Sequence, residues 1–447
     1  MFMKRNIFSH PWYIAVAALF LGACTFEQDD LFDESASLRI NHFSEDLKNR
    51  LVTQSSNGNN GWVIQYFVAG TDDETYEGVN LLGSFDASGK VTLAGNHRFL
   101  RNGNANKYTE SVSFYELLKE EGPIISFNTW NDVLMVLVDP VNPTTGAHDG
   151  VGMNGDQNLA FKAYEGNSIL FRGERHGAEV RFVPCDRPWN QYYTDVDAFK
   201  KKITNTTVTN YYVISGRDTM YLSGLNKGVA TYKERIVEPL ESKILTCVFS
   251  PDGFRLNHVD TIGANTFQEF KLSEDQTHLV NENGSVKVSA CWDVYVANHS
   301  AVWKFDKDLF SAEQNDLFNK IDTEVKKFNK DYSLESVGIG QTTGANKVSG
   351  LVLTFYTNAA KTKTNIAGVA FTQSRPASGQ LKIEYNAEDK IDKNMGSIAK
   401  KAPDVETYAR AFAQMLNGTY NVTPNDYFLP TGGDFTAVNG GITFRLK

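Results

Sequence analysis

Four segments of the chain carry apolar residues three or four positions apart, a spacing that places them on one face of a helix. Polar residues stand where these helices would begin: Asp33 or Ser35 for the first, a capping box at Ser311–Gln314 for the third, and Asp404 for the fourth. The apolar positions are Ala36, Ile40, Phe43, Leu47 and Leu51; Tyr192, Val196, Phe199 and Ile203; Phe318, Ile321, Val325 and Phe328; and Val405, Tyr408, Phe412 and Met415. The pattern predicts four amphipathic helices.

Runs rich in β-branched and aromatic residues follow the first three of these helices, at residues 61–70, 210–216 and 350–357. Such runs are typical of buried strands, and each is followed by a glycine turn. The turns lie at Gly89, Gly253 and Gly379. The sequence therefore predicts a β-rich α+β fold of antiparallel, meander-like sheets, each packed with an amphipathic helix and repeated two or three times. The alternative is that this order arises by chance, as it does in any α+β protein.

The repeated order divides the chain into three expected modules, at residues 35–188, 189–305 and 306–447. Pro184 and Pro188 precede the second helix, and Ser311 opens the third. Each module is long enough to form its own core. Because ligands favour domain interfaces, we expect any binding site at a junction between modules.

The first 24 residues follow a different pattern. Lys4 and Arg5 precede an apolar run from Tyr13 to Leu21, which is about half the length of the ~20 apolar residues that a membrane span needs. Leu21-Gly22-Ala23-Cys24 comes next and resembles the lipobox of bacterial lipoproteins. The sequence thus predicts a signal peptide at residues 1–23, cleavage between Ala23 and Cys24, and lipidation of the Cys24 thiol.

Residues 24–34 form an acidic tether. Five acids, among them Glu27, Asp29 and Asp30, precede the first base, Arg39. One interpretation is a solvated spacer that an anionic membrane repels. The other rests on resemblance to surface lipoproteins of the Bacteroidota, in which an acidic tract after the lipidated Cys marks export. We expect an outer-membrane protein that is lipid-anchored and faces the cell exterior.

The net charge argues against one class of partner. The formal net charge is −9, and no basic block interleaved with aromatic residues occurs, which argues against nucleic-acid binding.

Beyond Cys24 there are three cysteines, Cys185, Cys247 and Cys291, so at most one disulfide can form. Buried free thiols are the favoured interpretation, and no pair has the spacing of a zinc knuckle.

Catalytic motifs are missing from the sequence. There is no His-Glu-x-x-His, no Gly-x-Ser-x-Gly and no phosphate-binding loop. The Asn154–Asn158 segment alternates like a calcium loop but has no closing Glu, so we interpret it as a polar loop. Asp72–Glu74 offers adjacent carboxylates that are more typical of solvent-facing loops than of a glycosidase. We expect no catalytic, cofactor-binding or metal-binding residues and no enzymatic activity.

One hairpin collects positive charge. Arg172, Arg175 and His176 lie within five residues of one another. They are either an anion-binding group or exposed charges that discourage edge pairing, and the second is the favoured interpretation.

The stretch from Gly122 to Pro184 resembles a Bacteroidota lipoprotein family known as domain of unknown function 4302. The matching boxes are Phe127–Asn131, Asp139-Pro140, Gly155-Asp156 with Phe161, and Phe171–Gly177. Asn128 and Met135 depart from the acid and the His that are common in the family.

The resemblance implies a place beside nutrient-import machinery, with a TonB-type transporter and a substrate-binding lipoprotein as possible partners. Our first hypothesis is a non-enzymatic accessory or binding component of an outer-membrane nutrient-uptake system. The alternatives are a secreted hydrolase with dispersed catalytic residues and a structural or adhesive surface scaffold. The sequence identifies no ligand.

Overall fold

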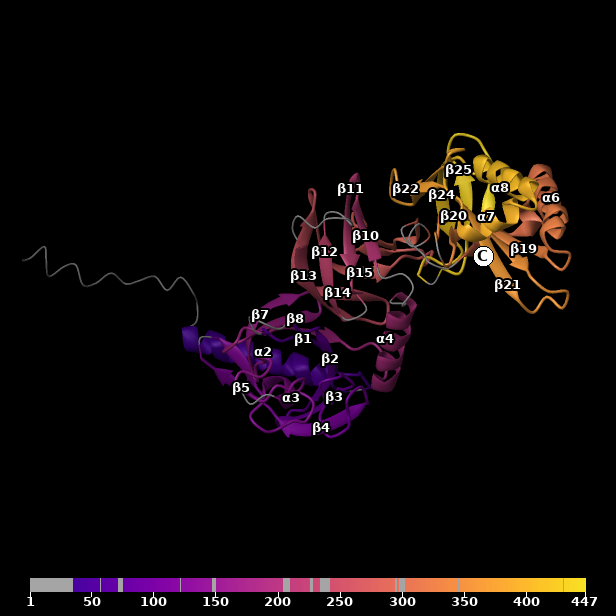
Figure 1. Ribbon diagram of the computed structural model, residues 1–447. Helices are drawn as coiled ribbons and strands as arrows, with labels where there is room; N and C mark the ends of the chain where they lie inside the picture. The colour runs from indigo at the N-terminus through magenta and orange to yellow at the C-terminus, as the bar shows by residue number, and fades with distance from the viewer. Residues whose placement is uncertain are drawn as a thin grey trace, which may run out of the picture.

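The computed structural model describes residues 35–447 except 57, 71–74, 121, 147–149, 204–209, 226–227, 234–241, 294–295, 297–301, 345 and 429. The predicted α+β class is confirmed, because antiparallel sheets dominate and helices pack against them. Figure 1 shows three units in a row, with a barrel between the first sheet and the C-terminal unit. No helix in the described part of the chain is both long and apolar enough to cross a membrane.

The first unit is a single nine-stranded antiparallel sheet. Its strand order is β4-β3-β2-β1-β9-β8-β7-β6-β5, so the two edge strands are neighbours in the chain with only Tyr115 between them. The sheet must therefore curl until its edges meet at Tyr115. The strands are β1 (Trp62–Phe67), β2 (Val79–Phe85), β3 (Lys90–Gly95), β4 (Thr109–Phe114), β5 (Glu116–Lys119), β6 (Pro123–Ser126), β7 (Asn158–Glu165), β8 (Ser168–Gly173) and β9 (Glu179–Pro184).

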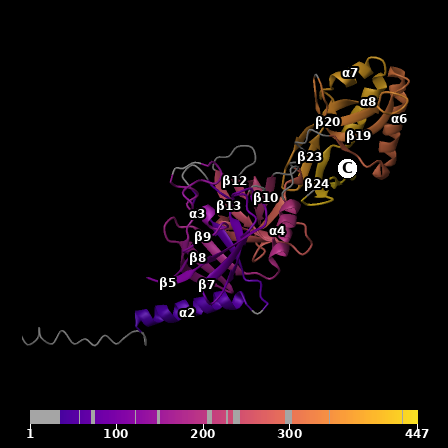
Figure 2. The same ribbon diagram turned by 90° about the horizontal axis from the view of Figure 1, so that it is seen from below.

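Helices fill the inside of the curled sheet. The short helix α3 (Met135–Val138) is buried there with alternate residues of β1, such as Ile64 and Tyr66. The helix α2 (Ala36–Gln54) adds Leu47 and Leu51 to the same cluster and runs along the unit at the end away from the barrel (Figure 2). Its N-cap is Ser35, one of the two residues expected.

The outer face of the sheet is covered by α4 (Trp189–Ile203) and the barrel. Val63, Leu82 and Ala94, which are cross-strand neighbours on β1, β2 and β3, belong to the same buried cluster as α4 and the barrel strands. The side-chain amide of Asn80 donates to the Phe249 carbonyl at 2.6 Å, and this bond joins the sheet to the barrel directly. The first two units thus share a core.

The barrel is closed by eight antiparallel strands in sequence order, and β10 pairs with β17 to complete the ring. Its strands are β10 (Asn210–Ser215), β11 (Asp218–Ser223), β12 (Val229–Lys233), β13 (Ser242–Phe249), β14 (Gly253–Ile262), β15 (Asn265–Leu272), β16 (Leu279–Asn281) and β17 (Lys287–Ala290). The predicted turn at Gly253 joins β13 to β14. A register shift between Arg255 and Asp260 marks a bulge in β14.

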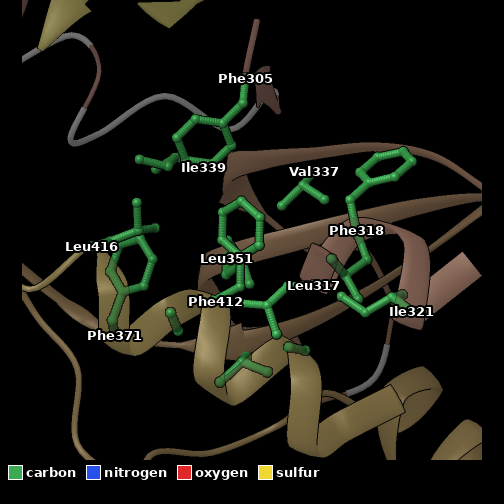
Figure 3. Packing of buried hydrophobic residues seen from close by; sticks show 14 of the residues in the cluster. Phe305, Leu317, Phe318, Ile321, Val337, Ile339, Leu351, Phe371, Phe412 and Leu416 are labelled. Carbon is green, nitrogen blue, oxygen red and sulfur yellow. The ribbon is translucent and has the colours of Figure 1, made fainter. Parts of the chain in front are cut away.

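The C-terminal unit combines two sheets, β18-β19-β20-β21 and β22-β23-β24-β25-β26, with three helices around one core. Figure 3 shows Phe412 of α8 and Phe318 of α6 among the strand residues Val337, Ile339 and Leu351. The elements are β18 (Trp303–Lys304), η2 (Lys307–Leu309), α6 (Ala312–Phe328), β19 (Ser333–Gln341), β20 (Ser349–Tyr356), β21 (Thr364–Ala370), β22 (Thr372–Ser374), β23 (Gln380–Glu384), α7 (Lys393–Ala399), α8 (Pro403–Met415), β24 (Gly418–Pro424), β25 (Gly433–Ala437) and β26 (Phe444–Leu446).

The start of α6 confirms one predicted cap, and the start of α8 corrects another. Ser311 and Gln314 form both bonds of the capping box at α6. The prediction of Asp404 as the cap of the last helix is wrong, because α8 begins at Pro403 with Ala402 as its N-cap. Proline at the first helical position has a preset φ and no N–H to satisfy, so it starts this helix without a side-chain cap.

The barrel and the C-terminal unit are joined by buried contacts. Phe428, from the loop between β24 and β25, is buried in the cluster that the barrel shares with the first sheet. Trp292 and Trp303, which both precede residue 306, pack edge to face at 5.0 Å in the C-terminal core. Arg375 also donates to the Tyr212 hydroxyl, which itself donates to Asp293 at 2.6 Å.

The buried His97 makes the first unit sensitive to acid. Its Nε2 lies 3.2 Å from the Val133 carbonyl, and burial lowers its pKa to about 4. Below pH 6.5 His97 becomes protonated in the unfolded chain, whereas in the folded chain it stays neutral until about pH 4. The free energy of unfolding therefore falls as the pH falls through this window. We expect His97 to account for about 2–3 kcal/mol of lost stability between pH 7.5 and 4.5.

Urea unfolding at the two pH values measures this loss. His97→Gln keeps an N–H donor for Val133 but cannot titrate, so its stability should fall less than that of the wild type. His258→Gln, at an exposed histidine of the barrel, is the matched control and should behave like the wild type. An equal loss in His97→Gln and the wild type would contradict the assignment.

Candidate ligand-binding site

Asp156 lies in the polar loop that the sequence predicted at Asn154–Asn158, and its carboxylate is buried against the end of the β8–β9 hairpin. It is 3% exposed and accepts backbone N–H bonds from Arg175, His176 and Ala178 at 2.9–3.2 Å. The polar-loop interpretation holds for residues 154–157, but it did not include the burial of this carboxylate. Spacing alone could not show it, because the three donors lie about 20 residues further along the chain. The carboxylate fixes the hairpin and is not offered to solvent.

The glycines of the same boxes allow the close approach that this arrangement needs. A Cβ on Gly173 would lie 1.9 Å from Oδ2 of Asp156, and one on Gly155 would lie 2.4 Å from the Leu137 carbonyl. Both distances are far below van der Waals contact. The Tyr66 hydroxyl completes the arrangement by hydrogen bonding to both the N–H and the carbonyl of Asp156.

The other residues that resemble the family also make contacts that stabilise the fold. The buried Asn131 donates to the Ser111 carbonyl and accepts from the N–H groups of Val133 and Leu134, which anchors the turn before α3. Asp139 pairs with Arg101 at 2.7 Å. Phe161 packs edge to face on Phe43 of α2 at 4.7 Å.

Two positions depart from the family pattern, and they differ in their surroundings. Met135 is buried in α3, within the core of the first unit, whereas Asn128 is exposed.

The positively charged hairpin does not form an anion site. Arg172 and Arg175 are exposed, and the backbone amides of Arg175 and His176 are already bonded to Asp156. Arg172 lies 4.0 Å from Glu179 on the next strand. The interpretation as exposed charges therefore fits the contacts better.

Several sequence predictions fall outside the described residues or concern groups that are buried. Ala23, Cys24, Glu27, Asp29, Asp30 and the Asp72–Glu74 acids all lie outside the described ranges. Cys185, Cys247 and Cys291 are free and buried, as favoured. Burial raises the pKa of Cys247 to about 12, which keeps this thiol protonated. No cluster of three metal-ligating side chains occurs within the described ranges.

A hollow of about 380 Å³ opens where the first turn of α4 meets the outer face of the first sheet. We call it the junction hollow. Its lining combines rings with amide, hydroxyl and carboxylate groups. The ring residues are Tyr108, Pro188 and Trp189, and the polar residues are Asn59, Asn60, Ser84, Glu110 and Asn190.

Local bonds hold the two aromatic side chains of the junction hollow in place. Trp189 is half-buried, and its Nε1 donates to the Asn60 carbonyl at 2.7 Å. Tyr108 donates to the Glu110 carboxylate and packs edge to face on Tyr193 of α4, with ring centroids 5.9 Å apart. Desolvation and the Glu110 bond raise the pKa of Tyr108, so its hydroxyl remains a donor.

Two further hollows are less suited to a ligand. One, of about 230 Å³, lies in the barrel wall at the β14 bulge, where Lys243 and Asp260 form an ion pair across it at 3.1 Å. The other, of about 430 Å³, lies between α2 and β5 and is lined by charges of both signs, such as Glu45, Lys48, Glu116 and Lys119. Neither presents a tryptophan among its lining residues.

Sequence reasoning found none of the residues of the junction hollow. Tyr108 and Trp189 are 81 positions apart in the sequence and belong to no motif. Only the expectation that a binding site would lie at a junction between modules pointed to this place. Pro188 entered the sequence prediction only as a residue that precedes the second helix, and Trp189 did not enter it.

Comparisons with known proteins identify a family of unknown activity. A family profile described as "Domain of unknown function (DUF4302)" matches residues 28–274, which is more than half of the chain. No curated protein matches. Among solved structures, the DNA polymerase III beta chain of Streptococcus pneumoniae TIGR4 is similar at 8% identity, covering 90% of this chain and 97% of its own, with a TM-score of 0.13.

The DNA polymerase sliding clamp of Bacillus subtilis is similar at 7% identity, covering 90% of this chain and 96% of its own, with a TM-score of 0.10. Likeness at such TM-scores carries no argument about fold or function.

Removing the Asp156 carboxylate should destabilise the first unit. Asp156→Ala leaves the backbone N–H groups of Arg175, His176 and Ala178 without their acceptor, and we expect a loss of about 2–4 kcal/mol. Arg175→Ala, at an exposed residue of the same hairpin, should change stability by less than about 0.5 kcal/mol. The shift of the urea midpoint measures both. Similar midpoints for the two variants would show that the carboxylate does not hold the hairpin.

Proposed function

This chain belongs to the DUF4302 family, and from that premise we propose that it is a lipid-anchored binding protein of the outer membrane. It faces the cell exterior, holds a ligand in the junction hollow and hands it to nutrient-import machinery without chemical change. The partners proposed are a TonB-type transporter and its substrate-binding lipoprotein.

The observation that carries this proposal is the junction hollow itself. It lies at the contact between the first unit and α4, and it offers rings and hydrogen-bonding groups side by side. Ligand sites typically combine apolar contact area with a few placed polar groups that fix orientation, and they favour such junctions.

The anchoring sequence supports the location. Leu21-Gly22-Ala23-Cys24 follows a short apolar run, and the acidic tether of residues 24–34 leads into α2. Eleven residues can extend to at most about 40 Å. A lipid on Cys24 would therefore keep the first unit, which carries the junction hollow, close to the membrane and to a transporter within it.

We expect Cys24→Ala to lose membrane attachment, because the thiol is the only proposed point of lipidation. Palmitate labelling and membrane fractionation measure this. Cys291→Ala is the matched control and should label like the wild type, since its buried thiol is unavailable to acyl transfer. Equal labelling of Cys24→Ala and the wild type would overturn the anchor.

Replacing Glu27, Asp29 and Asp30 by Ala should leave lipidation intact but reduce exposure on the cell surface. Protease shaving of intact cells measures the exposed fraction. Changing three exposed acids elsewhere, Glu313, Asp316 and Glu388, controls for charge alone. If the tract variant is shaved as readily as the wild type, the acidic residues act only as a tether.

A further inference from the structure

We propose that the ligand of the junction hollow is an uncharged saccharide, held by stacking on Trp189 and Tyr108 and by hydrogen bonds to the polar lining residues. This inference rests on the proposed binding function and names the chemical class that the site recognises. It follows from three properties of the hollow: its rings, its polar groups and its charge.

The rings offer carbon surface rather than polar atoms. The single polar atom of the Trp189 side chain is already bonded to the Asn60 carbonyl, and the Tyr108 hydroxyl is bonded to Glu110. What each ring presents to the hollow is therefore its π-face or edge. Saccharide rings carry C–H groups on their faces, and an aromatic ring with fixed orientation matches such a face at low entropic cost.

The polar groups match hydroxyls. Glu110 accepts from Tyr108 through Oε1, and its Oε2 has no hydrogen-bond partner in the described part of the chain. Asn59 donates its amide to the Thr53 carbonyl, which leaves its Oδ1 as an acceptor. Asn190 supplies both a donor and an acceptor, as Ser84 does through its hydroxyl. A polyhydroxylated ligand both donates and accepts, so it satisfies this mixed set.

The charge of the lining argues against anionic ligands and purely apolar ligands. Glu110 is the one ionised group lining the junction hollow, and no lysine, arginine or histidine is among the lining residues. The nearby Arg187 is bonded to Asp186 and Asp195. A phosphate, nucleotide or carboxylate ligand would meet only repulsion, and a lipid chain would leave the carboxylate and amides desolvated without partners.

The exposed face of β4 extends the site beyond one ring. Val112 and Phe114 follow Tyr108 and Glu110 on the same face of the strand, and each is 53% exposed. At a strand rise of about 3.4 Å per residue, the row from Tyr108 to Phe114 spans about 20 Å. An oligosaccharide seated on Trp189 and Tyr108 would therefore continue along β4.

The test uses the full-length lipidated protein extracted in detergent and a panel of defined probes. The uncharged probes are maltohexaose, cellohexaose, xylohexaose and mannohexaose, and the anionic control is hexagalacturonate. Binding is measured by titration calorimetry. We expect at least one uncharged probe to bind and hexagalacturonate not to bind.

Variants locate the site. Trp189→Ala should weaken binding at least tenfold, and Trp189→Phe should recover part of the loss because it keeps a ring. Trp130→Ala is the matched control: this tryptophan is 58% exposed on the same unit but outside the junction hollow. It should leave the affinity within twofold. If Trp189→Ala does not fold, the exposed Asn190→Ala and Tyr108→Ala variants take its place.

The outcomes separate this inference from the proposed function. Failure of every uncharged probe, with anchoring and transporter co-purification intact, overturns the saccharide and leaves the binding protein standing. Binding that is lost in Trp130→Ala and kept in Trp189→Ala overturns the site. Binding of hexagalacturonate alone overturns the charge argument.

Discussion

The position of α4 between two β structures is the constraint on which the rest of the molecule depends. Tyr192, Tyr193, Val196 and Phe199 are all buried there, and at about 1.5–3 kcal/mol for each buried side chain their burial outweighs any single hydrogen bond. The Tyr193 hydroxyl lies 3.1 Å from the Asn80 carbonyl and 2.9 Å from that of Ala94. Apolar burial thus holds the helix, and the hydroxyl sets its position along the strands.

The junction hollow is a consequence of this packing. A helix of 15 residues is about 22 Å long and covers only part of the face of a nine-stranded sheet. Val63, Leu82 and Ala94 lie under the helix and the barrel, whereas Ser84, Tyr108 and Glu110 extend past them on the same face. The exposed face of the sheet thus changes from apolar to polar and aromatic residues where α4 and the barrel no longer cover it. The junction hollow therefore lies at the edge of the interface between the first sheet and α4.

Local sequence patterns predicted the positions of helices and turns, but they could not predict which strands pair over long distances in the sequence. The helical spacings placed α2, α4, α6 and α8, and the glycine turns placed hairpins at Gly89, Gly253 and Gly379. Nothing local could show that β4 and β5 end at opposite edges of one sheet, or that β10 closes on β17. The same limit hid the junction hollow, whose walls come from four separated segments, and the role of Asp156, whose donors lie on the β8–β9 hairpin.

The residues that identify the family and the residues that line the site are different sets. Gly155, Asp156 and Gly173 hold the interior of the first unit, so the resemblance they carry is a resemblance of fold. Tyr108, Glu110 and Trp189 lie outside those boxes. The family match also ends at residue 274, before β16 and β17, yet the barrel closes only when β17 pairs with β10. Since that barrel shares its core with α4 and the first sheet, the unit that forms the junction hollow must extend at least to Ala290.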